Sequence, residues 1–190
     1  AFKPKKDKSP KVSQEKIKEI NTIKIMDSID ELLGKEYPEL VSQTKADIKR
    51  MIEEDAFLSS EEKSLNAQEK QKIVEGKIGE LLQQLEVYLR GNITETISGK
   101  SVSFGTAGFR GIIGEVFDFD GVALIAQSMS NIINSDSSLP KAVFFGNDTR
   151  FLGKWYSLVM ERVFTANGIK VYTTSDKQGV VATPSISCYL

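Results

Sequence analysis

Residues 142–173 read AVFFGNDTRFLGKWYSLVMERVFTANGIKVYT, and this stretch decides the fold class. Residues 142–145 (AVFF) form an apolar run of strand length, and residues 169–173 (IKVYT) form a second one. Between them, residues 152–166 carry apolar side chains at helical spacing, and Gly168 follows as a natural end of the helix. The order strand, helix, strand predicts parallel pairing with a right-handed crossover.

Two further elements precede this unit. Residues 101–104 (SVSF) predict a short strand, and residues 119–134 predict a helix with Asp120 as its N-cap. The helical spacing predicts that Val122, Ile125, Met129 and Ile132 share one apolar face. Near the end of the sequence, Thr183 and Pro184 have the pattern of a helix start, and we expect that helix to be incomplete within these residues. Alternating strands and helices predict an α/β fold.

The two halves of the 190 residues differ in composition. The first 95 residues hold 17 basic side chains, 19 acidic side chains and four glycines. The second 95 residues hold 8 basic side chains, 7 acidic side chains and ten glycines. We therefore predict a Lys- and Pro-rich disordered arm at residues 1–11, an all-helical extension at 12–95 and an α/β domain at 96–190. The polar stretch at residues 91–100 is the expected boundary.

Helix signals recur along the first half. Ser13 is a plausible N-cap, Ser28 with Glu31 predicts a turn that restarts a helix, and Ser59 with Glu62 has capping-box spacing. An apolar stripe with helical spacing follows and ends at Gly91; it consists of Val74, Ile78, Leu81, Leu85 and Tyr88. We expect these helices to pack on each other and on the second half. The alternative is a helical module that binds a partner.

Composition excludes several kinds of site. The sequence has no histidine and a single cysteine, which excludes a Ser-His-Asp triad, a histidine-based zinc site and an intramolecular disulfide within these residues. The net charge of -1 argues against nucleic acid as the main partner. No apolar run approaches the roughly 20 residues that span a bilayer. We expect a soluble cytoplasmic protein without a membrane partner.

The richest local signal is the glycine loop at residues 104–114, FGTAGFRGIIG. Its glycines permit a backbone that approaches a ligand closely, and free N–H groups of such a loop bind anions. Arg110 adds a guanidinium that matches phosphate oxygens in pairs. The predicted phosphate-binding residues are Gly105, Thr106, Gly108, Arg110 and Gly111. The alternative is a structural turn in which the arginine pairs with a nearby carboxylate.

A second loop, GNDTRFLG at residues 146–153, directly follows a predicted strand. Ligands of open α/β sheets bind at the carboxyl ends of strands, so Asp148 and Arg150 are candidates for ligand contact or for locking the loop. We favour the locking role, because a buried polar loop needs such pairing. Asp118 and Asp120 alone are weak evidence for a metal, and we predict no metal site in this chain.

Three segments in the same order resemble the first domain of the α-D-phosphohexomutases, the phosphoglucomutase and phosphomannomutase family. They are FGTAGFRG, GNDTRFLG and VATPSIS, and the resemblance covers residues 101–190. It implies a three-layer α/β/α domain I, incomplete at its C-terminus, of an isomerase that moves phosphate between the 1 and 6 positions of a sugar. It further implies a phosphoserine, Mg²⁺ and a sugar 1,6-bisphosphate activator, with Arg110 as an active-site residue and Thr106 and its glycines shaping the same pocket.

One departure from the family qualifies this expectation. The family places its phosphoserine in a Thr-Ala-Ser-His-Asn-Pro motif shortly after the Thr-Pro-x-x-Ser segment, and these 190 residues do not contain it. We therefore expect this chain alone to be inactive, with Mg²⁺ bound by residues outside it and with the remaining domains of the enzyme and a phosphosugar as partners. The sugar stays open. The alternative is a non-catalytic module that binds a sugar phosphate or a protein.

Overall fold

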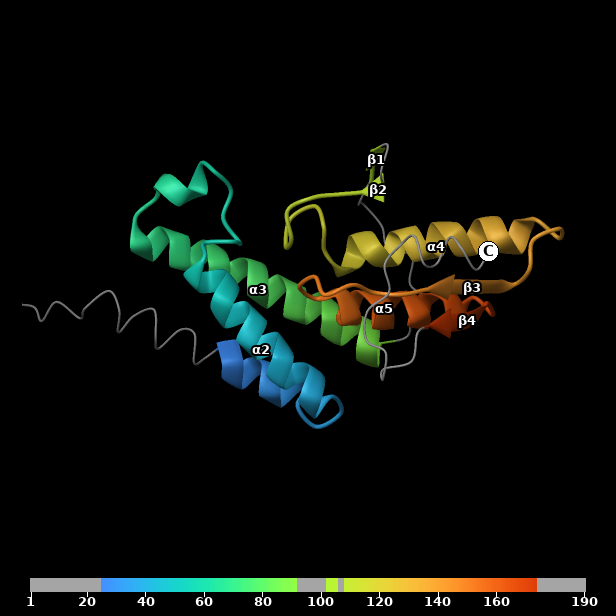
Figure 1. The fold of residues 1–190 in the computed structure, drawn as a ribbon, viewed down its shortest axis with the longest axis horizontal. Helices are drawn as coiled ribbons and strands as arrows, with labels where there is room; N and C mark the ends of the chain where they lie inside the picture. The colour runs from blue at the N-terminus through green and yellow to red at the C-terminus, as the bar shows by residue number, and fades with distance from the viewer. Residues whose placement is uncertain (1–24, 92–101, 106–107, 174–190) are drawn as a thin grey trace, which may run out of the picture.

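The structure is a computed structural model and describes residues 25–91, 102–105 and 108–173. Residues 25–33 are helical. The further elements, in chain order, are α2 (Pro38–Glu53), the 3-10 turn η1 (Glu62–Ser64), α3 (Ala67–Arg90), β1 (Phe104–Gly105), β2 (Gly108–Phe109), α4 (Phe119–Ser135), β3 (Ala142–Phe145), α5 (Gly153–Ala166) and β4 (Lys170–Thr173) (Figure 1). The fold is α/β, with helices and small sheets.

The predicted strand–helix–strand unit is confirmed. β3 and β4 pair in parallel, in register from Ala142 opposite Lys170 to Phe145 opposite Thr173, and α5 connects them. The helix ends as predicted before Gly168, whose φ of 72° lies in the left-handed region that glycine tolerates.

The helix predicted at residues 119–134 is confirmed as α4, but its predicted apolar face is wrong in part. Met129 and Ile132 are 42% and 60% exposed, whereas Ala123, Ala126 and Ser130 are fully buried. Small side chains let two helix backbones approach closely, and α4 contacts both α5 and α3. The buried stripe is therefore set by side-chain size as well as by hydrophobicity.

The N-cap of α4 is Asp118, and the prediction of Asp120 is wrong. A carboxylate oxygen of Asp118 accepts a hydrogen bond from the Gly121 N–H at 2.8 Å. Asp120 lies inside the first turn and instead accepts a hydrogen bond from the Tyr88 hydroxyl at 2.8 Å. Spacing alone did not separate two aspartates that stand two residues apart.

The first predicted strand is shorter and pairs differently. Among the described residues the strand begins at Phe104, and it pairs antiparallel with β2 in a hairpin rather than joining β3 and β4. Gly108 has a φ of 110°, and the glycine-rich sequence can therefore reverse the chain within a few residues.

Of the two helix-capping predictions in the first half that fall on described residues, one is wrong and one is confirmed. The helix at residues 25–33 is continuous, so the restart predicted at Ser28 is wrong. The Ser59–Glu62 capping box is confirmed, because the Ser59 N–H donates to Glu62 and the Glu62 N–H to Ser59 Oγ, at 2.7 and 3.2 Å. It precedes η1 only, and α3 begins later, where Asn66 and Glu69 form a second capping box.

The apolar stripe of α3 is confirmed, since all five predicted residues are buried and Gly91 follows as C-cap. α2 was not predicted as an element. Its signals are Pro38 at the first helical turn and the buried side chains of Val41, Thr44 and Ile48 at helical spacing.

One hydrophobic core joins the two halves. It includes buried side chains from residues 25–33, α2, α3, α4 and α5, so the expectation that the helices pack on each other and on the second half is confirmed. The predictions for residues 1–11, Ser13, the boundary segment beyond Gly91 and Thr183–Pro184 fall outside the described residues. The domain boundaries stay predictions.

Candidate functional site

The glycine loop and the GNDTRFLG loop lie at the same end of the α/β unit. The starts of α4 and α5 meet at Tyr156, whose ring centroid lies 5.0 Å from that of Phe117 and 4.7 Å from that of Phe119. Their other ends meet where the Asn134 amide, in the last turn of α4, donates to the Asn167 carbonyl at 3.1 Å. The two helices therefore run in parallel, and both loops lie at the carboxyl end of β3, where open α/β sheets bind ligands (Figure 1).

Arg110 directly follows the β1–β2 hairpin. It is exposed, and no hydrogen bond or ion pair joins it to a residue in the described parts of the chain. Gly105 and Gly108 face each other across the hairpin, whereas Thr106 lies outside the described residues. None of the five N–H donors of the guanidinium is taken up by a residue that the structure describes.

The backbone on both sides of Arg110 is fixed by packing. On one side, the Phe109 ring stacks on Phe117 at 5.0 Å between centroids. On the other side, a Cβ added at Gly111 would come within 2.7 Å of the Val116 Cβ, which is closer than real Cβ atoms approach. Only glycine fits there without a shift of the backbone, so residues 116 and 117 support both neighbours of Arg110.

Helix α3 in turn holds the segment that follows the glycine loop. The Lys77 ammonium donates to Glu115 at 2.5 Å, the Gln84 amide to Asp118 at 3.0 Å and the Tyr88 hydroxyl to Asp120. The donors lie seven and four residues apart along one face of the helix. These contacts join the helical half to the start of α4.

The ionisable groups of this contact are kept in the states that these bonds require. Burial alone would lower the pKa of Lys77, but hydrogen bonds to Glu115 and Glu62 raise it above its ordinary value. Hydrogen bonds from the Ser59 N–H and from Lys77 lower the pKa of Glu62. Burial and the hydrogen bond to Asp120 raise the pKa of Tyr88. At neutral pH the lysine is therefore charged, and the tyrosine hydroxyl remains a donor.

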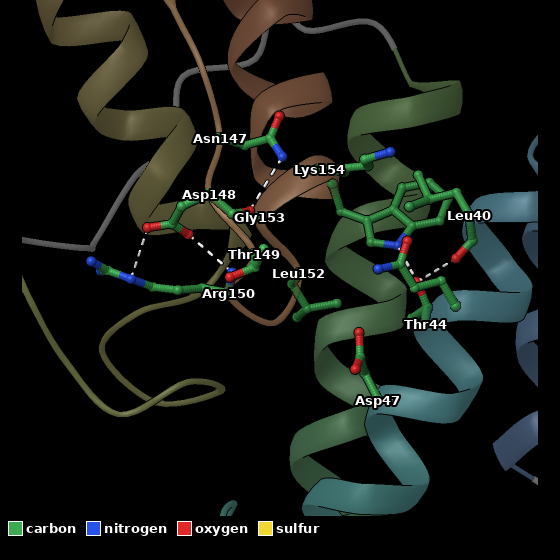
Figure 2. A pocket seen from close by; sticks show the side chains of 12 residues that line it. Leu40, Thr44, Asp47, Asn147, Asp148, Thr149, Arg150, Leu152, Gly153 and Lys154 are labelled. Atoms are coloured by element: carbon green, nitrogen blue, oxygen red, sulfur yellow. Dashed lines mark hydrogen bonds and ion pairs between the residues drawn. The ribbon is translucent and has the colours of Figure 1, made fainter. Parts of the chain in front are cut away.

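The GNDTRFLG loop lies opposite α2 across a pocket of about 190 Å³ (Figure 2). The pocket is lined by Leu40, Gln43, Thr44, Asp47, Asn147, Asp148, Thr149, Arg150, Leu152, Gly153, Lys154 and Trp155. One wall of the pocket is formed by the GNDTRFLG loop and the start of α5, and the other by α2. Helix α2 was not predicted from the sequence. The spacing of the buried residues on α2 could have indicated the helix, but no local pattern indicates what it faces.

Asp148 and Arg150 contact each other within the loop. Arg150 Nε lies 2.9 Å from Asp148 Oδ2, and the Arg150 N–H donates to Asp148 Oδ1 at 3.0 Å (Figure 2). The side chains are 41% and 87% exposed for Asp148 and Arg150. The pair lies within the loop and leaves the arginine largely in solvent. The locking role of these two residues stays a prediction.

The described residues offer no cluster of three or more His, Cys, Asp or Glu side chains that could hold a metal ion. No helix in the described ranges is both long and apolar enough to cross a bilayer.

Comparison with known proteins agrees with the motifs. Residues 101–190 match the family described as phosphoglucomutase/phosphomannomutase, alpha/beta/alpha domain I. No curated protein and no solved structure gives a significant match to the chain.

Proposed function

Because residues 101–190 belong to the phosphoglucomutase/phosphomannomutase family, as its domain I, we propose that this chain supplies a phosphate-binding loop of a phosphohexomutase. The reaction is the transfer of phosphate between the 1 and 6 positions of a sugar through a phosphoserine and a bisphosphorylated intermediate. Phosphoryl transfer depends mainly on positioning and charge stabilisation. The role of this part of the enzyme is to hold and orient a phosphate group.

The observation that carries the proposal is the state of Arg110. Its guanidinium is exposed and has no partner among the described residues, and it stands beside a glycine hairpin at the carboxyl end of β3. A guanidinium binds phosphate oxygens through two parallel N–H bonds. The fixed backbone around Phe109 and Gly111 allows Arg110 to meet the phosphate with little reorganisation. Mg²⁺, on which the family generally depends, falls to residues outside this chain.

The family match at residues 101–190 supports a domain of three layers, α/β/α, and the helices α2 and α3 support a helical extension before it. Phe144 and Tyr172 pair in register and are 39% and 49% exposed on the face of the sheet opposite Val143 and Val171. This apolar face is the natural place for the third layer. We further propose that the remaining domains of such an enzyme and its phosphosugar are the partners of this chain.

Replacing Arg110 by alanine should weaken binding of glucose 1,6-bisphosphate by about 10- to 100-fold, because a charge-assisted bidentate contact is lost. Isothermal titration calorimetry of the 190-residue chain measures this change. The affinity of Arg110→Lys should lie between those of the unmodified chain and Arg110→Ala, since lysine keeps the positive charge but cannot form two parallel hydrogen bonds. Arg90→Ala removes an exposed arginine at the end of α3 and should leave the affinity unchanged.

A thermal melt of each variant separates binding from folding. Equal melting temperatures with reduced affinity in Arg110→Ala support the phosphate role. Unchanged affinity in Arg110→Ala, or loss of the fold, contradicts it and leaves the loop as a structural turn.

The 190-residue chain alone should not catalyse the reaction. It contains neither histidine nor the Thr-Ala-Ser-His-Asn-Pro motif of the family's phosphoserine. Incubation with glucose 1-phosphate, glucose 1,6-bisphosphate and Mg²⁺ should yield no glucose 6-phosphate above the protein-free control. Sustained formation of glucose 6-phosphate would show that the nucleophile lies within these residues.

A further inference from the structure

We propose that Lys77, on a helix outside the family match, is a positioning residue for Arg110. The inference rests on the phosphate-binding function proposed above and names the part of the chain that sets its geometry. Lys77 does not meet the phosphate itself. It acts through the turn that supports both backbone neighbours of Arg110.

The first step is the contact between Lys77 and the turn at residues 112–117. The lysine stem packs on Gly114, where an added Cβ would lie 3.3 Å from the Lys77 Cβ, and Gly114 has a φ of 82°. The ammonium donates to Glu115 of the turn. The aliphatic part of the Lys77 side chain therefore contacts Gly114, and its ammonium binds Glu115, the next residue of the same turn.

The second step is the anchorage of Lys77 itself. Its ammonium also donates to the Phe57 carbonyl and to Glu62 Oε2, each at 2.9 Å, and the side chain is only 11% exposed. Glu62 is held in place by its capping box with Ser59. Lys77 thus ties the turn to two separate points of the helical half, and its shielding from solvent strengthens these charge contacts.

The third step leads from the turn to Arg110. The turn is closed by backbone hydrogen bonds from the Phe117 N–H to the Ile112 carbonyl and from the Gly114 N–H to the Phe117 carbonyl, both at 3.1 Å. Phe117 stacks on Phe109, and Val116 lies against Gly111. A shift of the turn therefore moves both residues that flank Arg110. A binding site tolerates displacements of its contacting groups of only about 0.5 Å. Loss of the Lys77 contacts should therefore lower the affinity for phosphate.

The test compares Lys77→Met with Lys70→Met. Lys70 lies on the same helix and also pairs with a carboxylate 15 residues away, Asp55 at 3.3 Å, but that pair joins residues of the helical half only. Lys77→Met should weaken binding of glucose 1,6-bisphosphate about 10-fold. Lys70→Met should leave the affinity unchanged, and Lys77→Arg should restore most of it, because a guanidinium offers enough donors for the same three acceptors.

A second measurement follows the turn without any ligand. Amide hydrogen exchange at residues 108–117 should be faster in Lys77→Met than in the unmodified chain and unchanged in Lys70→Met. If Lys77→Met does not fold, Glu115→Gln removes only the charge on the other side of the contact. It should likewise weaken bisphosphate binding and speed amide exchange at residues 108–117.

The outcomes separate the two proposals. If neither the unmodified chain nor Arg110→Ala binds the bisphosphate, the proposed function fails, and hydrogen exchange still decides whether Lys77 holds the turn. If Arg110→Ala weakens binding but Lys77→Met and Glu115→Gln do not, the positioning role is overturned while the function stands. Equal exchange in Lys77→Met and Lys70→Met overturns it as well.

Discussion

Replacing Trp155 by alanine should lower the free energy of unfolding by about 3–5 kcal/mol, because it removes a large buried side chain and leaves a cavity. Trp155 is 1% exposed, and its ring packs edge-on against Tyr37 at 5.3 Å between centroids. Its indole N–H donates to the Thr44 hydroxyl at 2.7 Å. Urea unfolding followed by circular dichroism measures the change, since Trp155 is the single tryptophan and its fluorescence is lost with it.

Two further variants separate packing from hydrogen bonding. Thr44→Val keeps the volume but leaves the buried indole N–H without an acceptor, which should cost about 1–3 kcal/mol. Val87→Ala shortens a side chain that is 63% exposed on α3 and should change stability by less than about 0.5 kcal/mol. A loss below about 1 kcal/mol in Trp155→Ala would mean that α2 and α5 do not pack as described.

Asp118→Ala should lower the free energy of unfolding by about 2–4 kcal/mol through two losses, the N-cap of α4 and a buried charged acceptor. Asp118 is 4% exposed and accepts hydrogen bonds from the Gly121 N–H and the Gln84 amide. The Gln84 oxygen in turn accepts from the Phe119 N–H at 3.1 Å. Loss of Asp118 therefore loosens the start of α4 from α3, and urea unfolding measures the effect.

Asp136→Ala is the matched control for Asp118. Asp136 is the C-cap residue of the same helix and is exposed, with Ser138 as its hydrogen-bond donor. Its replacement should cost less than about 1 kcal/mol. Equal losses in both variants would show that the buried contact with Gln84 adds nothing to the cap.

The elements predicted best are those with strong local signals. The apolar run at residues 142–145 was predicted to the residue, and α5 within one residue, because Gly168 fixes the end of the helix and the strands are short and apolar. The stripe of α3 was predicted for the same reason. Each pattern is complete within a single element.

The errors arise where tertiary contacts choose between local options. Asp118 and Asp120 both suit an N-cap, and the position of Gln84 and Tyr88 on α3 decides which side chain takes which role. The exposed Met129 shows the same effect, since close packing selects the small residues of α4. Long-range choices of this kind leave no trace in spacing.

The candidate site was predicted only as separate motifs. The sequence indicated Arg110 and the loop that contains Asp148, and the structure brings both loops to one end of the α/β unit. The contacts of Lys77 with Glu115 and of Thr44 with Trp155, each just beyond one of these loops, could not be predicted, because they join residues 38 and 111 positions apart.

The contact between Thr44 and Trp155 also bears on how the chain is made. The two residues are 111 positions apart, and a ribosome adds about 5–20 residues per second, so Thr44 emerges on the order of 5–20 s before its partner is synthesised. During that interval the surface of α2 that Trp155 later covers is open to chaperones and to other nascent chains. The core can close only after translation has passed α5, so packing of α2 waits for a segment that is made 111 residues later.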